Sequence, residues 1–299
     1  MIETTRTVPH NWRAHVSDYI ALTKPRIMSL LLVTALAGAV LGAGGMPGVI
    51  AFASVLVGGA MASGGASALN MWFEEDLDRR MGRTKARPVA TGRVSPRNAL
   101  VFGLLLNLGA FLVLAFGANI LAASLAILGT ILYFGLYTAW LKRSTVHNIV
   151  IGGSAGAVPP LVGYAAATGT LDLSAWYLFA IIFFWTPPHF WALALMIKDD
   201  YARAEVPMLP VVQGEDTTRL QILLYSILLG GLAIAFAVSS SRLGIIYVSG
   251  AAALSAWFVV EAARLVRRKN KAAAWSTYRY SLLYLFLLFG LIMADASIS

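Results

Sequence analysis

The feature that most constrains this chain is a series of long apolar segments with almost no charge. The segment Gly48–Leu69, for example, contains no charged side chain. Charged residues make up only 12% of the 299 residues, which is about half of the usual share in soluble proteins. A run of ~20 apolar residues can cross a bilayer as a helix, and these runs have no polar face to turn toward water. The sequence therefore predicts an all-α, polytopic membrane protein.

The apolar segments divide into nine predicted transmembrane helices, several of them separated by Gly and Pro turns. The predicted spans are Arg26–Ala43, Gly48–Leu69, Asn98–Phe116, Asn119–Trp140, His147–Ala167, Ser174–Ile197, Leu220–Ser239, Leu243–Leu265 and Tyr278–Ala294. The first twenty residues lack an apolar stretch before a cleavage site, so we expect no signal peptide. The chain also has no cysteine, which excludes disulfides and thiolate metal sites.

The basic residues predict how these helices are oriented. With nine spans, all but one of the 23 lysines and arginines fall on the same side of the membrane, and the exception is Arg242. Positive residues collect in the cytoplasm. We therefore expect a bacterial inner (plasma) membrane protein with a cytoplasmic N-terminal tail (1–20), cytoplasmic loops at 71–97 and 198–219, and an outside C-terminus. Topology and anionic lipid account for most of the net charge of +9, so we expect no nucleic-acid partner.

An acidic cluster follows the second span. The run from Asn70 to Arg80 contains four carboxylates and two arginines. Asn70, Glu74 and Asp78 are spaced by four residues, so they share one face of a helix. Their amide and carboxylate oxygens suit a divalent cation, and the basic residues that follow suit a diphosphate. The alternative is a charged, solvated helix end.

A second polar cluster ends the sixth span. His189 is predicted to lie two to three turns deeper in the membrane than Asp199 and Asp200, and an ionisable group at that depth indicates function. The alternative is a core histidine that is hydrogen-bonded to a neighbour. The pair Pro187-Pro188 is expected to kink or interrupt the helix. Because the two clusters lie four spans apart, they face the same side, which suggests two four-helix pseudo-repeats plus one helix around a single site.

Several segments resemble a known family. The row Asn70-x-x-x-Glu74-x-x-x-Asp78, followed by Arg83 and Arg87, resembles the first aspartate-rich motif of UbiA-type intramembrane prenyltransferases. Glu74 departs from that pattern, because the family usually has Asp there. Further segments resemble the protohaem IX farnesyltransferase (haem O synthase) branch, and these are Leu22–Arg26, Tyr137–Thr145, Ile151–Gly163, Pro188-His189 with Asp200-Tyr201, and Pro207–Val212.

The resemblance implies a single transmembrane prenyltransferase domain over residues 1–299, with the helix bundle around a central cavity. It implies transfer of a farnesyl group from farnesyl diphosphate to a vinyl group of protohaem IX, with water addition, to give haem O and diphosphate. The alternatives are a UbiA-type enzyme that prenylates a quinone precursor or chlorophyllide, and a transporter. The implied partners are the two substrates, the lipid bilayer and the downstream haem A synthase of cytochrome oxidase biogenesis.

The resemblance also implies roles for individual residues. The catalytic residues are Asn70, Glu74, Asp78 and Asp200. Mg²⁺ is expected on Asn70, Glu74, Asp78, Asp199 and Asp200. The diphosphate is expected on Lys24, Arg26, Arg83, Arg87, Lys142 and Arg143, and haem on His189. For His189 two roles stay open: a ligand of the haem iron, or a group that positions a haem propionate or water.

Overall fold

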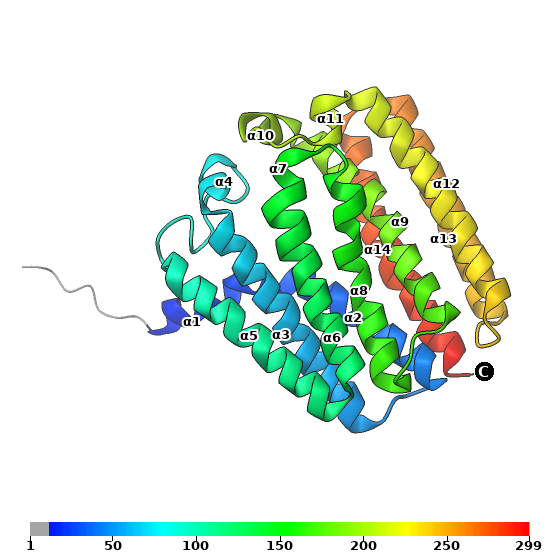
Figure 1. Cartoon of the computed structure of the whole chain (residues 1–299). Coiled ribbons are helices and arrows are strands. Elements are labelled where there is room, and N and C mark those ends of the chain that lie inside the picture. The colour runs from blue at the N-terminus through cyan, green and yellow to red at the C-terminus, as the bar shows by residue number, and fades with distance from the viewer. Residues whose placement is uncertain (1–11, 299) are drawn as a thin grey trace, which may run out of the picture.

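The computed structural model describes residues 12–298, and within that range its regular elements are all helices (Figure 1). Nine helical segments there are long and apolar enough to cross a membrane, which confirms the predicted number. They are α2 (Pro25–Ala43), α3 (Val49–Phe73), α5 (Pro96–Gly117), the composite span Ile120–Ser144, α8 (Asn148–Thr168), α9 (Leu173–Met196), α12 (Glu215–Ser239), α13 (Ile245–Arg268) and α14 (Lys271–Ala296).

Two spans differ from expectation in their helical geometry. The fourth consists of α6 (Ile120–Thr130), a π-helical segment η1 (Ile131–Leu141) and the single turn α7 (Lys142–Ser144). π-Helical turns are rare in proteins, and those that do occur are often found at functional sites. In the sixth, α9 runs continuously through Pro187 and Pro188, so the prolines do not interrupt the helix, and the alternative of a kink stays a prediction. Membrane helices tolerate proline because neighbouring groups satisfy the freed backbone carbonyls.

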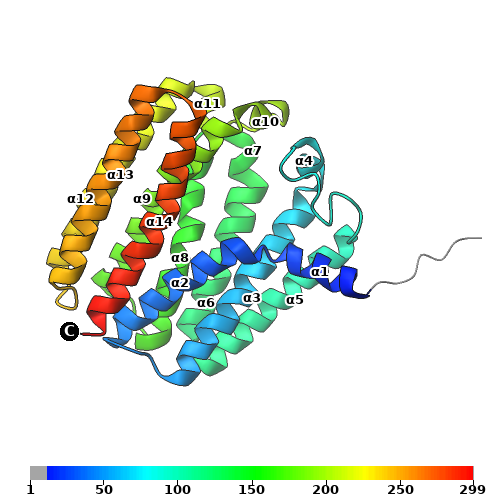
Figure 2. The same ribbon diagram turned by 180° about the vertical axis from the view of Figure 1, so that it is seen from behind.

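Short helices lie between the spans. They are α1 (Trp12–Leu22), α4 (Glu75–Arg80), α10 (Lys198–Arg203) and α11 (Leu209–Val212). Figures 1 and 2 place α4, α10, α11 and α7 at the same end of the bundle. Of the predicted N-terminal tail, residues 1–11, including Arg6, lie outside the described residues, and the remainder forms α1, which the sequence reasoning did not foresee.

The helices pack through close backbone contacts. α2 runs along α8, α3 runs along α5, and α14 packs against α13, α9 and α2. At the α2–α8 contact, a Cβ atom on Gly163 would lie only 1.7 Å from the Ala35 carbonyl oxygen, and one on Gly38 would lie 2.1 Å from the Pro160 carbonyl oxygen. Small residues allow membrane helices to approach this closely, so these glycines are needed for the observed packing. The proposed pseudo-repeats and central cavity stay predictions.

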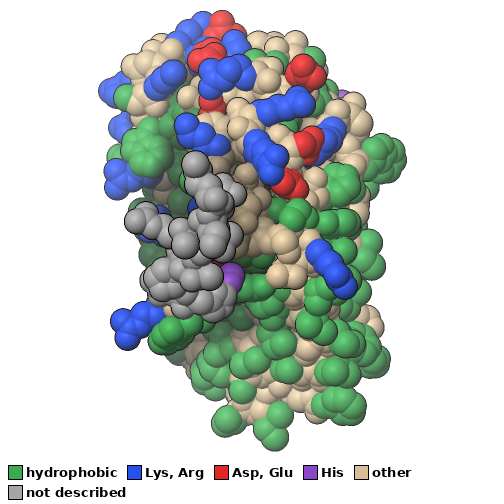
Figure 3. All heavy atoms as spheres, turned by 90° about the vertical axis from the view of Figure 1, so that its left-hand side faces the viewer, with side chains coloured by type: hydrophobic (Ala, Val, Ile, Leu, Met, Phe, Trp, Pro, Cys, Tyr) green, Lys and Arg blue, Asp and Glu red, His purple; other side chains and the backbone are tan. Residues whose placement is uncertain are grey.

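The surface separates into a charged end and an apolar body. Figure 3 shows Lys, Arg, Asp and Glu gathered mainly over the upper part of the viewed face, with hydrophobic side chains below. Exposed leucines and a valine along α5 fit contact with lipid. Arg242, the predicted exception to the charge rule, lies at the other end, where its guanidinium donates to the carbonyl oxygens of Leu41 and Gly42 at the end of α2.

Candidate active site

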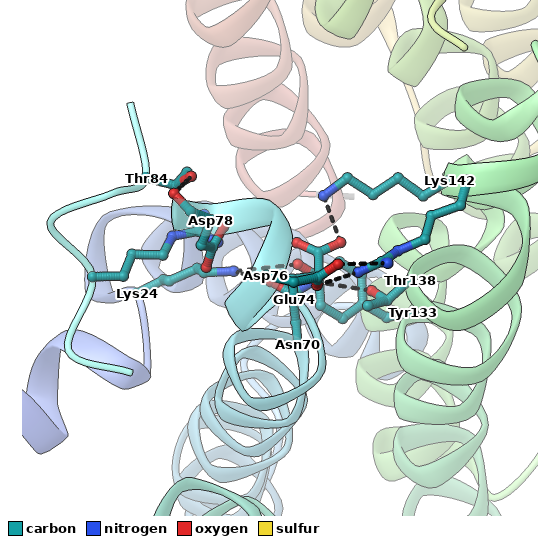
Figure 4. A network of polar contacts seen from close by, with 11 residues as sticks. Lys24, Asn70, Glu74, Asp76, Asp78, Thr84, Tyr133, Thr138 and Lys142 are labelled. Carbon is teal, nitrogen blue, oxygen red and sulfur yellow. Dashed lines mark hydrogen bonds and ion pairs between the residues drawn. The ribbon is translucent and has the colours of Figure 1, made fainter. Parts of the chain in front are cut away.

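The predicted row of Asn70, Glu74 and Asp78 lies where α3 meets α4. Glu74 is the single residue between the two helices. The helical hydrogen-bond pattern nevertheless continues, because Glu74 N donates to Asn70 O at 3.0 Å and Asp78 N donates to Glu74 O at 2.7 Å. All three residues are buried, with exposed fractions of 2%, 1% and 1%. The three side chains are therefore held as one buried polar row at the end of an apolar span (Figure 4).

Lys24 contacts the first residue of this row. Its Nζ donates to Asn70 Oδ1 at 2.8 Å and to the Tyr133 hydroxyl at 3.4 Å, while Asn70 Nδ2 donates to Thr138 Oγ1 at 3.1 Å. Lys24 precedes α2 with a left-handed backbone (φ 51°), which is uncommon for a residue with a side chain. Burial, and secondly the Arg87 guanidinium, lower the pKa of Lys24 to about 7. A bound anion would raise the pKa of Lys24 and return its side chain to the protonated form.

The two carboxylates of the row are each held by a predicted diphosphate-binding residue. Lys142 Nζ donates to Glu74 Oε1 at 2.5 Å. One terminal nitrogen of Arg87 lies 2.7 and 2.8 Å from the two carboxylate oxygens of Asp78. Thr84 Oγ1 also donates to the Asp78 main-chain oxygen at 3.2 Å, which ties the following loop to the row. The buried charges are therefore compensated in pairs, as buried charges must be.

Asp76 and Arg143 form a separate pair on the outside of α4. Two guanidinium nitrogens donate to the Asp76 oxygens at 3.0 and 2.7 Å, and both residues are exposed. The Arg143 hydrogen bond lowers the pKa of Asp76. The guanidinium carbon also lies 5.5 Å from the centre of the Phe73 ring. Arg143 therefore stands at the edge of the site, one step outside the buried row.

The second acidic cluster meets the loop that follows α4. A Cβ atom on Gly82 would lie 3.4 Å from Asp200 Oδ2, so this carboxylate of α10 sits against the loop. The Asp200 side chain also accepts from Arg203. Next to it, burial raises the pKa of Tyr201, and a hydrogen bond from Arg83 opposes that rise. Residues about 120 positions apart thus meet at one end of the bundle, as the clusters predicted.

His189 is enclosed by aromatic rings and by α14. Its ring stacks on Trp185 at 4.4 Å and on Tyr278 at 4.8 Å, measured between ring centres. Its Nδ1 lies 2.7 Å from Ser281 Oγ. His189 is 7% exposed, so it has the hydrogen-bonded core environment that the sequence reasoning raised as the alternative to a haem contact. This environment orients the ring and is compatible with either interpretation.

Not every predicted residue joins the row. Arg26 and Asp199 are exposed, and within the described residues neither forms a hydrogen bond or ion pair with Asn70, Glu74 or Asp78. The sequence analysis assigned no role to Tyr133, Thr138 and Tyr201, which lie against Lys24, Asn70 and Arg83. Tyr133 and Tyr137 are four residues apart and their rings stack at 6.0 Å. That spacing of polar aromatics in an apolar span was the available signal.

The donor chemistry fits a hard divalent cation, but the carboxylates are not gathered around one point. Asn70, Glu74 and Asp78 supply the amide and carboxylate oxygens that Mg²⁺ prefers. Among the residues that the structure describes, however, no group of three or more His, Cys, Asp or Glu side chains is placed to hold a metal ion. Each carboxylate instead faces a lysine or arginine. Diphosphate oxygens and an exchange of these pairs would be needed to complete a magnesium site.

Comparison with known proteins gives consistent matches over most of the chain. Residues 31–289 match the family described as "UbiA prenyltransferase family". A "Protoheme IX farnesyltransferase" of Thermus thermophilus is 52% identical over 96% of this chain and 46% of that protein. The protein of the same name from Symbiobacterium thermophilum is 49% identical over 94% of this chain and 95% of that protein. The chain therefore spans about half the length of the first curated relatives it matches, and nearly all of others.

Two solved structures share the fold at low sequence identity. One, described as digeranylgeranylglyceryl phosphate synthase in membranes, aligns with a TM-score of 0.79 and 16% identity, over 95% of this chain and 99% of the other. A UbiA homolog from Archaeoglobus fulgidus bound to GPP and Mg²⁺ aligns with a TM-score of 0.67 and 15% identity, over 92% and 99%. These likenesses show the common helical architecture.

Proposed function

The chain belongs to the UbiA prenyltransferase family, and from that premise we propose that it transfers the farnesyl group of farnesyl diphosphate to a vinyl group of protohaem IX. Water adds in the same reaction, and the products are haem O and diphosphate. Relatives about 50% identical to this chain carry the name protoheme IX farnesyltransferase. The observation that carries the proposal is the buried row Asn70–Glu74–Asp78, in which every member contacts a lysine or arginine.

The three cations are the diphosphate-binding groups. Lys24, Lys142 and Arg87 come from separate elements and converge on one row, where Lys142 and Arg87 pair with carboxylates and Lys24 donates to the neutral amide of Asn70. Buried ion pairs contribute little net stability, because the cost of desolvation offsets the attraction. Such pairs can therefore exchange partners at a small net cost. When farnesyl diphosphate binds, the cations turn from the carboxylates to the phosphate oxygens, and Arg83 and Arg143 extend the site at its edge.

The freed oxygens would form the magnesium site. Asn70, Glu74 and Asp78 would hold the ion from the first cluster, and Asp200, with Asp199, would hold it from the second. Support comes from the hard-oxygen donors of the row and from the related fold of the Archaeoglobus fulgidus homolog with GPP and Mg²⁺. Bound there, Mg²⁺ would supply positive charge that stabilises the leaving diphosphate.

The chemistry proceeds by loss of diphosphate. The bond between the farnesyl C1 and the phosphate oxygen breaks, and its electron pair leaves with the diphosphate, whose growing charge Lys24, Lys142 and Arg87 stabilise. The π electrons of a haem vinyl group form the new carbon–carbon bond to C1. The oxygen of water then bonds to the remaining electron-poor carbon and releases a proton. His189 contacts the haem, and the stacked rings of Trp185 and Tyr278 keep its surroundings dry.

The setting of the reaction follows from the charge distribution. We place the acidic row, its basic partners and the N-terminal side in the cytoplasm of a bacterial cell, with the C-terminus outside the inner membrane. The whole chain, residues 1–299, then acts as one transmembrane domain with loops 71–97 and 198–219 at the site. Haem O is released to a downstream enzyme that oxidises it, for which haem A synthase is the proposed partner.

The direct test uses purified protein in detergent. Haem, farnesyl diphosphate and Mg²⁺ should yield haem O, detected by mass spectrometry, and Asp78→Ala and Asp200→Ala should abolish it. Glu75→Gln is the matched control, because Glu75 belongs to the same acidic run but pairs with Arg79 on the outside. Product from 4-hydroxybenzoate or chlorophyllide, with none from haem, would instead indicate another UbiA-type substrate. Detergent solution supports no transmembrane gradient, so a transporter would show no turnover there. Product formation that Asp78→Ala and Asp200→Ala abolish would therefore argue against a transporter.

A further inference from the structure

His189 and Ser281 connect the middle of α9 to α14. Ser281 is fully buried, and its Oγ lies 2.7 Å from His189 Nδ1 and 2.7 Å from the main-chain oxygen of Tyr278. The Trp185 indole donates to the Ser281 main-chain oxygen at 2.7 Å. Both faces of the imidazole are covered, by Trp185 and by Tyr278. The ring is therefore fixed in position, with one nitrogen committed to Ser281.

The two short contacts of Ser281 decide where the imidazole proton lies. A carbonyl oxygen can only accept a hydrogen bond, so the contact with Tyr278 uses the single proton of the Ser281 hydroxyl. The hydroxyl oxygen must then accept from His189, which places the proton on Nδ1. In the opposite arrangement the hydroxyl donates to Nδ1, and two acceptor oxygens face each other at 2.7 Å with no proton between them.

We infer that Ser281 holds His189 in the tautomer protonated at Nδ1, so that Nε2 presents an unprotonated lone pair to the iron of the haem substrate. The inference rests on the proposed function and deepens it. A haem propionate is an acceptor and would need an N–H donor, whereas iron needs a lone pair, so the tautomer selects the iron-ligand role. Ser281 is a positioning residue, like the hydrogen-bond partners that orient metal-bound histidines elsewhere.

The tautomer is tested without haem by ¹⁵N NMR of histidine-labelled protein in which His10, His15 and His147 are replaced. The wild-type side chain should show a protonated Nδ1 and an unprotonated Nε2 at neutral pH. Ser281→Ala should shift the population toward the Nε2–H form. Ser255→Ala is the control, because it removes another buried serine hydroxyl that contacts α14, through Tyr284, and should leave the spectrum unchanged. A wild-type Nε2–H tautomer would overturn the inference.

The role toward iron is tested by titrating haem into the full-length protein and recording the iron–histidine band by resonance Raman spectroscopy. His189→Ala should remove the band, and Ser281→Ala should lower its frequency and weaken haem affinity about tenfold or more. In the His189→Ala background, Ser281→Ala should have no further effect. An unchanged band in either single variant would overturn the inference. Wild-type synthesis of haem O, measured alongside, separates that outcome from failure of the proposed function.

Discussion

Lys142 Nζ lies 2.5 Å from Glu74 Oε1, although the two residues come from different spans and both are largely buried. Arg87 forms an ion pair with Asp78 in the same way, and Lys24 donates a hydrogen bond to the neutral amide of Asn70. Residues that were expected to bind two different parts of a magnesium–diphosphate complex thus contact each other. We propose that substrate binding exchanges the partners of these pairs.

The Glu74–Lys142 pair should depend on charge more than on side-chain length. Glu74→Gln removes the charge that compensates Lys142, and breaking one side of a buried pair costs ~3–5 kcal/mol of stability. We expect loss of farnesyl transfer of at least a hundredfold and a lower melting temperature. Glu74→Asp should keep activity within about tenfold, because Asp is the usual family residue. Equal activity of Glu74→Gln and the native protein would contradict this.

Arg87 should act on farnesyl diphosphate rather than on haem. Arg87→Ala should raise the KM for farnesyl diphosphate by one to two orders of magnitude, because it removes about 1.5–2.7 kcal/mol of charge-assisted binding. The KM for haem should change little. Arg93→Ala is the control, since Arg93 pairs with Asp18 outside the row. Steady-state kinetics with each substrate varied in turn give the answer, and a selective effect on haem would be inconsistent with the assignment.

Lys24 should make diphosphate binding take up a proton. Its pKa is lowered from 10.5 to about 7, so at pH 8 the ligand-free side chain is mostly neutral and a bound diphosphate recharges it. Calorimetric titration with a non-reactive farnesyl diphosphate analogue in buffers of different ionisation enthalpy should show this uptake. Lys24→Arg, which stays charged, should reduce it. Undiminished uptake in that variant would assign the proton elsewhere.

The same pKa shift has a consequence for stability. Between pH 7 and 10.5 the unfolded chain binds the Lys24 proton that the folded protein releases. Stability of the ligand-free protein from this group therefore rises with pH across that window and is lost as the pH falls through about 7. Lys24→Arg should flatten this part of the stability profile, which thermal unfolding at several pH values would detect.

Close packing of α2 on α8 should make Gly163 intolerant of a side chain. A Cβ atom there would lie 1.7 Å from the Ala35 carbonyl oxygen, so Gly163→Ala forces the helices apart and should cost ~1–3 kcal/mol or more. Gly156→Ala on the same helix meets no atom within 4 Å and should be neutral or slightly stabilising. Thermal unfolding in detergent distinguishes the two, and equal melting temperatures would argue against the packing described.

Much of the fold could be predicted from the sequence, because charge-free runs of membrane-crossing length leave few alternatives to a helical bundle. The spacing of Asn70, Glu74 and Asp78 likewise predicted one row, and the structure keeps it by helical hydrogen bonds across the junction at Glu74. The π-helical geometry of η1 was not predictable, since its composition is that of any apolar helix.

The sequence could not predict which side chains contact each other between the spans. Nothing in the local pattern indicates that Lys142 faces Glu74, or that His189 meets Ser281 at a separation of 92 residues. Those pairings arise from how the spans pack, which depends on small residues such as Gly38 and Gly163 far from the site. The sequence likewise did not indicate that Arg26 and Asp199 are exposed, whereas their neighbours Lys24 and Asp200 are partly buried.

The most direct measurement is the rate of haem O formation by the purified protein with haem and farnesyl diphosphate, with Mg²⁺ present or removed by chelation. We predict haem O formation that requires Mg²⁺, that falls at least a hundredfold in Asp78→Ala, and that persists in Glu75→Gln. Two results would contradict the assignment of the buried row as a magnesium–diphosphate site for farnesyl transfer. One is that the folded protein forms no haem O, and the other is that neither chelation nor Asp78→Ala changes the rate.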